Sequence, residues 1–145
     1  MFENNPEMSH YKRYNILIGW LSFAIAAFVY LSTIEPTASF WDCGEFIATA
    51  FKLEVGHPPG APFFMILGRF FTLFAGEAEN AAMMMNGMSA LASAFTILFL
   101  FWTITHLGRK VLIKKEEDYT RTNLIVILGS AFIGSLAYTF TDTFW

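Results

Sequence analysis

Apolar residues fall in three long runs along the chain, separated by shorter polar segments. The first run holds twenty-one uncharged, mainly apolar residues, 14–34, between Arg13 and Glu35. At about 1.5 Å per residue, a helix of this length crosses a hydrocarbon core of about 30 Å. Two further runs, 81–107 and 122–141, are also long enough to span a bilayer. The pattern therefore predicts an all-α integral membrane protein with about three transmembrane helices.

The distribution of basic residues predicts how these helices are threaded. Lys12 and Arg13 precede the first run, and the polar segment 108–121 is rich in Lys and Arg. The positive-inside rule places both on the cytoplasmic side. Residues 35–80 then form one long non-cytoplasmic loop. Within it, the short apolar stretch 63–74 is expected to be an interfacial or re-entrant helix.

Composition and charge narrow the class of protein further. Only 14% of the residues are charged, against 55% that are hydrophobic, which is typical of a chain that lies largely in lipid. Nine basic and twelve acidic residues give a net charge of −3, so nucleic acid is not an expected partner. The single cysteine, Cys43, excludes a disulfide framework within the chain and a thiolate-rich metal site.

Two carboxylates stand close together at the start of the external loop. A helix starting near Ser39 would place Asp42 and Glu45 on one face, because they are three residues apart. One interpretation is purely structural, with Ser39 capping the helix and acids favoured in its first turn. In the other, aromatic neighbours partly desolvate Asp42, which suits it to take a proton from a hydroxyl. Glu45 would then orient the acceptor, tune Asp42 or bind a divalent cation with it, but two carboxylates alone do not predict a metal site.

A rigid corner follows these acids at residues 56–62. Pro58 and Pro59 fix the backbone φ angle, and the flanking glycines, Gly60 among them, permit a sharp reversal. His57 is presented from this corner. It is either a surface hydrogen-bonding residue or a functional one that pairs with the candidate base or binds a phosphate oxygen.

Arg69 interrupts the apolar stretch 63–74. A cation in such a helix either extends to the lipid headgroups or pairs with an anionic lipid-linked group. Both interpretations stay open from the residues alone.

The segment 40–62, FWDCGEFIATAFKLEVGHPPGAP, resembles the first external loop of the protein O-mannosyltransferase-like family, which belongs to the GT-C glycosyltransferases. Members of that family carry a D-x-G-E element soon after the first transmembrane helix, followed by H-P-P-G. Asp42, Gly44 and Glu45 match the first element, and residues 57–60 match the second. The resemblance implies that residues 1–145 are the amino-terminal membrane module of a larger enzyme with more spanning helices.

The resemblance also implies an activity and a set of partners. The enzyme would transfer a sugar, mannose, from a polyprenyl-phosphate carrier to a hydroxyl of an exported protein, with Asp42 and Glu45 as catalytic residues. His57 and Arg69 would bind the substrate, and the lipid-linked donor is the only cofactor-like molecule implied. The expected location is a bacterial inner membrane, with the amino terminus in the cytoplasm.

The alternative from another class is a non-catalytic membrane scaffold or a transporter subunit. A transporter should carry polar residues at mid-membrane depth, and the three long runs hold almost none. A scaffold would tolerate the loss of Asp42, Glu45 and His57, so substitution of these residues separates the two classes.

Overall fold

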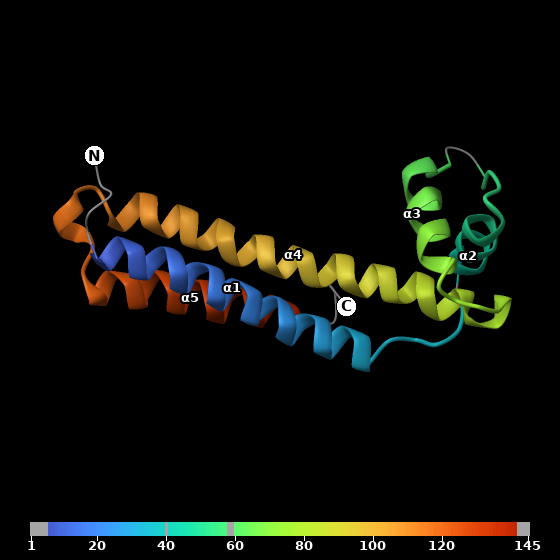
Figure 1. Cartoon of the computed structure of the whole chain (residues 1–145), viewed down its shortest axis with the longest axis horizontal. Helices are drawn as coiled ribbons and strands as arrows, with labels where there is room; N and C mark the ends of the chain where they lie inside the picture. The colour runs from blue at the N-terminus through green and yellow to red at the C-terminus, as the bar shows by residue number, and fades with distance from the viewer. Residues whose placement is uncertain (1–5, 40, 58–59, 142–145) are drawn as a thin grey trace. The chain divides into compact units, whose positions relative to one another are not determined.

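The computed structural model describes residues 6–39, 41–57 and 60–141, and every regular element in these segments is helical (Figure 1). The elements are α1 (Pro6–Ser32), α2 (Cys43–Lys52), α3 (Pro62–Thr72), the 3-10 turn η1 (Ala78–Asn80), α4 (Ala81–Leu112), the 3-10 turn η2 (Glu116–Asp118) and α5 (Arg121–Thr139). The predicted all-α fold is confirmed.

Three of these helices are long and apolar enough to cross a membrane: α1, the continuous segment Ala78–Leu112, and α5. They correspond to the three predicted runs and make the chain an integral membrane protein. Two helices extend several residues beyond their runs at one end: α1 begins at Pro6, since proline suits the first turn of a helix, and α4 continues to Leu112. Two helices end before their runs do, α1 at Ser32 and α5 at Thr139. Helix ends follow backbone hydrogen bonding and not hydropathy, which is why the apolar pattern does not fix them.

The chain divides into two compact units, the first of which joins residues 1–29 to 93–145. Its described part packs α1, the carboxy-terminal part of α4, and α5 around a buried cluster that includes Phe101, Ile127 and Ala131. The Trp102 indole N–H donates to the carbonyl of Asn15 at 3.3 Å. At Gly19, a Cβ would lie 2.7 Å from the indole nitrogen of Trp102. Small residues therefore allow the helices of this unit to approach closely.

The connection between α4 and α5 is held by one carboxylate. Asp118 Oδ2 accepts hydrogen bonds from the backbone N–H groups of Lys114 at 2.9 Å and Lys115 at 2.8 Å. These bonds hold the pKa of Asp118 below its ordinary value. Thr120 then caps α5 by accepting from the N–H of Asn123 at 3.3 Å. The predicted polar segment is thus an ordered turn.

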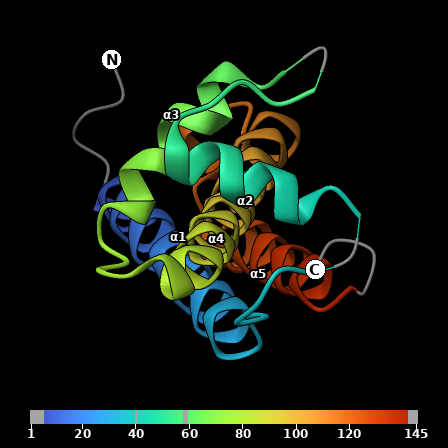
Figure 2. The same ribbon diagram turned by 90° about the vertical axis from the view of Figure 1, so that its right-hand side faces the viewer.

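The second unit, residues 30–92, contains α2 and α3 and the first turns of α4. Figure 2 shows α2 and α3 lying beside each other next to the start of α4. Ala50, Met65, Met85 and Met88 form the buried core of this unit. The predicted helix in the apolar stretch is confirmed as α3, whose exposed side carries the large apolar residues Phe63, Ile66 and Phe70, and the exposed Leu73 and Phe74 follow directly after it. Such a surface suits contact with lipid, and the position of α3 at the membrane surface stays a prediction.

Gly68 allows α3 to pack closely against α2 and α4. A Cβ at this position would lie 2.9 Å from the Ala50 Cβ and 2.6 Å from the Met85 sulfur. Both distances are below ordinary van der Waals contact. The unit can therefore pack in this way only because residue 68 has no side chain.

We expect Gly68→Ala to destabilise the second unit by about 1–3 kcal/mol, the usual cost of adding a methyl group to a filled core. Gly44→Ala is the matched control, because a Cβ there meets nothing within 4 Å. Thermal unfolding of both variants in detergent, measured beside the unsubstituted protein, checks this expectation. Equal unfolding temperatures for the two variants would contradict it.

Candidate functional site

α2 begins at Cys43, so the prediction of a helix starting near Ser39 is wrong. Trp41 lies just before it in the left-handed backbone region, with φ at 66°, and this reversal prevents the helix from extending towards Ser39. Asp42 occupies the N-cap position, where its carbonyl accepts the N–H of Phe46 at 3.0 Å. Its side chain makes no capping hydrogen bond. Ser39 Oγ instead contacts Cys43 Sγ at 3.3 Å.

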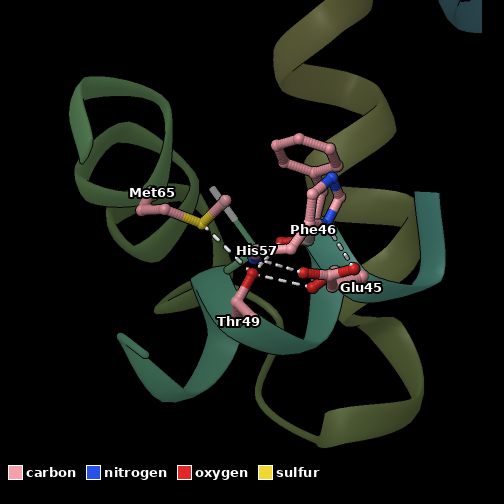
Figure 3. Close-up of polar contacts among 5 residues, drawn as sticks. All are labelled: Glu45, Phe46, Thr49, His57 and Met65. Carbon is pink, nitrogen blue, oxygen red and sulfur yellow. Dashed lines mark hydrogen bonds and ion pairs between the residues drawn. The ribbon is translucent and has the colours of Figure 1, made fainter. Parts of the chain in front are cut away.

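Glu45 binds His57 through both of its carboxylate oxygens (Figure 3). Oε1 accepts the backbone N–H of His57 at 2.8 Å, and Oε2 lies 2.8 Å from the ring nitrogen Nδ1. Gly56 makes this approach possible, because a Cβ there would lie 3.2 Å from Glu45 Oε1. The first turn of α2 and the loop after it are thus joined by two hydrogen bonds to one carboxylate.

The two ends of the predicted corner, His57 and Gly60, are joined by a hydrogen bond. The N–H of Gly60 donates to the carbonyl of His57 at 2.9 Å, and Gly60 has a φ of +73°, which favours glycine. Pro58 and Pro59 lie outside the described residues, so their proposed role in stiffening the corner stays a prediction. The reversal at Gly60 itself is confirmed.

Asp42 is not the partner of His57, and the described residues do not enclose it. Its side chain is exposed and makes no hydrogen bond or ion pair within the described segments. The neighbouring Trp41 is 97% exposed and does not shield it. The expectation of a carboxylate desolvated between aromatic rings is therefore not met by this part of the chain. The proton-accepting role of Asp42 stays a prediction.

The charges of Glu45 and His57 stabilise each other. The backbone hydrogen bond from His57, followed by the bond from its ring, holds the pKa of Glu45 below its ordinary value. The hydrogen bond to Glu45, and then the negative charge of that carboxylate, raise the pKa of His57, with a smaller contribution from Asp42. Each group thus favours the charged form of the other.

Two residues that the sequence did not single out, Phe46 and Thr49, connect this pair to α3. Phe46 meets the rings of His57 and Phe64 edge-on, with centroid distances of 6.4 and 5.6 Å. Thr49 donates to the carbonyl of Glu45 at 2.7 Å and contacts the Met65 sulfur at 3.2 Å. The only sequence signal was the spacing of four between Glu45 and Thr49, which places both on one side of α2.

Arg69 makes a contact within the chain that the sequence did not predict, and its predicted role in binding substrate stays a prediction. From α3 its guanidinium donates to the carbonyl of Phe51 and lies over the Phe51 ring, 5.6 Å from the centroid. This carbonyl is in the last turn of α2, where carbonyl groups lack partners within the helix. Arg69 therefore caps the carboxy-terminal end of α2, whereas Asp42 and Glu45 lie at its amino-terminal end. The structure does not bring Arg69 together with His57.

Among the described residues, no group of three or more His, Cys, Asp or Glu side chains is arranged to hold a metal ion.

Comparison with known proteins places these residues in a family context. The family described as "Protein O-mannosyl-transferase TMEM260 N-terminal domain" matches residues 42–145. "Protein O-mannosyl-transferase tmem260" from Dictyostelium discoideum is 31% identical over 85 residues, which is 58% of this chain and 10% of the relative. "Protein O-mannosyl-transferase TMEM260" from Mus musculus is 35% identical over 87 residues, 59% of this chain and 12% of the relative. The chain thus corresponds to a small part of these relatives, and no solved structure matches it.

The raised pKa of His57 gives the corner a defined dependence on pH. Ion pairing contributes fully to stability below the ordinary histidine pKa of 6.5, as long as Glu45 is ionised, and is lost as the pH rises through the raised pKa of His57. We expect the amides of His57 and Gly60 to exchange faster with deuterium on the alkaline side, after correction for intrinsic rates. In Glu45→Gln this additional acceleration should be absent. Protection of the two amides that does not change with pH would contradict the assignment.

Proposed function

The chain belongs to the protein O-mannosyl-transferase TMEM260 N-terminal domain family, and from this membership we propose that it forms the amino-terminal module of a membrane glycosyltransferase of the GT-C type. The enzyme transfers mannose from a polyprenyl-phosphate carrier to a protein hydroxyl. The names of the two relatives support mannose and a protein acceptor. The lipid-phosphate donor is a proposal from the motif resemblance. Both relatives are eukaryotic, so they lend no support to the predicted bacterial inner membrane.

The observation that carries this proposal is the contrast between the two acids of α2. Both oxygens of Glu45 accept hydrogen bonds from His57, whereas the side chain of Asp42 is exposed at the start of the helix. A general base needs a lone pair that can reach the proton of the substrate. Asp42 meets this requirement without breaking an ion pair, and it is therefore the proposed base.

The reaction follows from these roles. The acceptor hydroxyl attacks the anomeric carbon of mannose in line with the bond to phosphate, and Asp42 takes the hydroxyl proton as the new C–O bond forms. The bond between the anomeric carbon and the phosphate oxygen breaks, and its electron pair leaves with the lipid phosphate. The configuration at the anomeric carbon inverts. Positioning and electrostatic stabilisation suffice because phosphate is a good leaving group, so no covalent enzyme intermediate is needed.

Asp42→Asn tests the base directly. The Asp42 side chain makes no capping hydrogen bond, and asparagine is tolerated at an N-cap as well as aspartate, so insertion and abundance should be unchanged. Loss of the basic group should lower mannose transfer on the order of a hundredfold or more. The measurement is transfer from polyprenyl-phosphate mannose by the complete protein that contains this chain, at matched abundance.

Glu54→Gln is the control for this test, since Glu54 is an exposed acid that follows α2 in the same unit. It should transfer mannose normally. Near-normal turnover by Asp42→Asn would exclude Asp42 as the base. If the complete protein transfers mannose at the normal rate with each of Asp42→Asn, Glu45→Gln and His57→Gln, a non-catalytic scaffold role is favoured for this module.

The proposed orientation places the amino terminus in the cytoplasm and residues 35–80 on the opposite side. In a background without Cys43, cysteines at Glu54 or Glu77 should react with reagents that do not cross the membrane, whereas a cysteine at Lys114 should not. All three positions are exposed in the structure, so burial does not confuse the result. Labelling at Lys114 alone would reverse the orientation.

A further inference from the structure

We propose that the His57 imidazolium donates a hydrogen bond to the phosphate of the lipid-linked donor, and that Glu45 is a positioning residue that holds this ring in place. The inference rests on the proposed function and deepens it, because it assigns the phosphate end of the donor to a particular atom, Nε2 of His57.

First, the two ring nitrogens of His57 differ in whether they can bind a ligand. Nδ1 of His57 faces Glu45 Oε2 at 2.8 Å, so the proton on Nδ1 is directed at the carboxylate. Nε2 has no hydrogen-bond partner among the residues that the structure describes, and the His57 side chain is 52% exposed. In the imidazolium both ring nitrogens carry a proton. One N–H donor therefore remains free for a ligand.

The second step is that the ring is held before any ligand binds. The backbone N–H of His57 is fixed by Glu45 Oε1, and the carbonyl of His57 is fixed by the N–H of Gly60. Phe46 lies edge-on to the ring, with an angle of 70° between the planes. A donor held at both backbone ends and at one ring nitrogen loses little conformational freedom when it binds a ligand.

The third step is the charge at this end of α2. Asp42 and Glu45 are both acidic, and a phosphate would add further negative charge beside them. Among the described residues, His57 contacts Glu45 directly, and its charge, when the ring is protonated, also interacts with that of Asp42. Arg69, the basic residue of α3, binds the carbonyl of Phe51 in the last turn of α2. The residues of α3 that meet the site, Phe64 and Met65, are uncharged.

These steps give the two acids separate tasks in the reaction. As the bond to the anomeric carbon breaks, negative charge grows on the phosphate oxygen, where a charge-assisted hydrogen bond from Nε2 is most stabilising. Asp42 takes the proton of the acceptor at the same stage. Glu45 contacts neither reactant and acts through His57, which it keeps oriented and protonated.

The experiment measures binding of a sugar-free polyprenyl phosphate to the complete protein in nanodiscs, with polyprenol and inorganic phosphate as separate arms. Hydrogen bonds to charged groups contribute about 1.5–3 kcal/mol, so His57→Gln should weaken polyprenyl-phosphate binding roughly tenfold or more. Binding of polyprenol should be unchanged. Inorganic phosphate should bind far more weakly, because it lacks the lipid chain. Glu54→Gln is the control and should bind polyprenyl phosphate normally.

A pH profile distinguishes the positioning role of Glu45 from a merely structural one. In the unsubstituted protein, binding should weaken as the pH rises through the raised pKa of His57. In Glu45→Gln this weakening should begin at lower pH, because the carboxylate that favours the imidazolium is gone. In His57→Gln this weakening should be absent, and only the dependence imposed by the titration of the phosphate monoester itself should remain. An unshifted profile in Glu45→Gln would contradict the positioning role.

Two other outcomes would overturn the inference. One is unchanged polyprenyl-phosphate binding in His57→Gln, or an equal loss of polyprenol binding. The other is inorganic phosphate binding as tightly as the lipid form, which would exclude a lipid-linked ligand. Binding is measured without transfer, so this test is independent of the sugar. Absence of mannose transfer would contradict the proposed function and leave the binding result intact.

Discussion

The two hydrogen bonds that the Glu45 carboxylate accepts from His57 are the constraint on which the candidate site depends. They join residues twelve positions apart, at 2.8 Å each, and so close the loop that follows α2 back onto its first turn. One of them is a backbone bond, so the position of the chain as well as the ring is fixed. Without it, the corner at Gly60 and the acids of α2 would be separate features of a long loop.

This closure depends in turn on the packing of α2 against α3. Gly68 brings the α3 backbone close to Ala50, Thr49 contacts Met65, and Arg69 binds the last turn of α2 through Phe51. Apolar contact, a hydroxyl and a cation thus act at three consecutive residues near the carboxy-terminal end of α2. A helix of ten residues has little stability alone in water, so these contacts explain why α2 is ordered enough to carry a site.

Much of the fold could be predicted from sequence. A run of about twenty apolar residues forms a spanning helix because of the membrane around it, and hardly at all because of neighbouring elements. The sequence also named candidate residues in the loop, but it did not predict which residues they contact in the structure. The left-handed backbone at Trp41, which moved the helix start to Cys43, has no signal in the residue type. That His57 contacts Glu45 and not Asp42 depends on the path of the loop. Likewise, the contact of Arg69 with a carbonyl depends on how α3 crosses α2.

The spacing of three between Asp42 and Glu45 places two similar groups in different surroundings. Asp42 stands at the N-cap, where the helix does not surround its side chain, whereas Glu45 lies in the first turn of α2, opposite the returning loop. Two carboxylates in unlike surroundings are a common way of separating chemical roles in one site. The loop that engages both oxygens of Glu45 also brings His57 close enough for its charge, when the ring is protonated, to interact with Asp42. Closing the loop therefore occupies one acid and leaves the other exposed, and the proposed division of roles rests on this contrast.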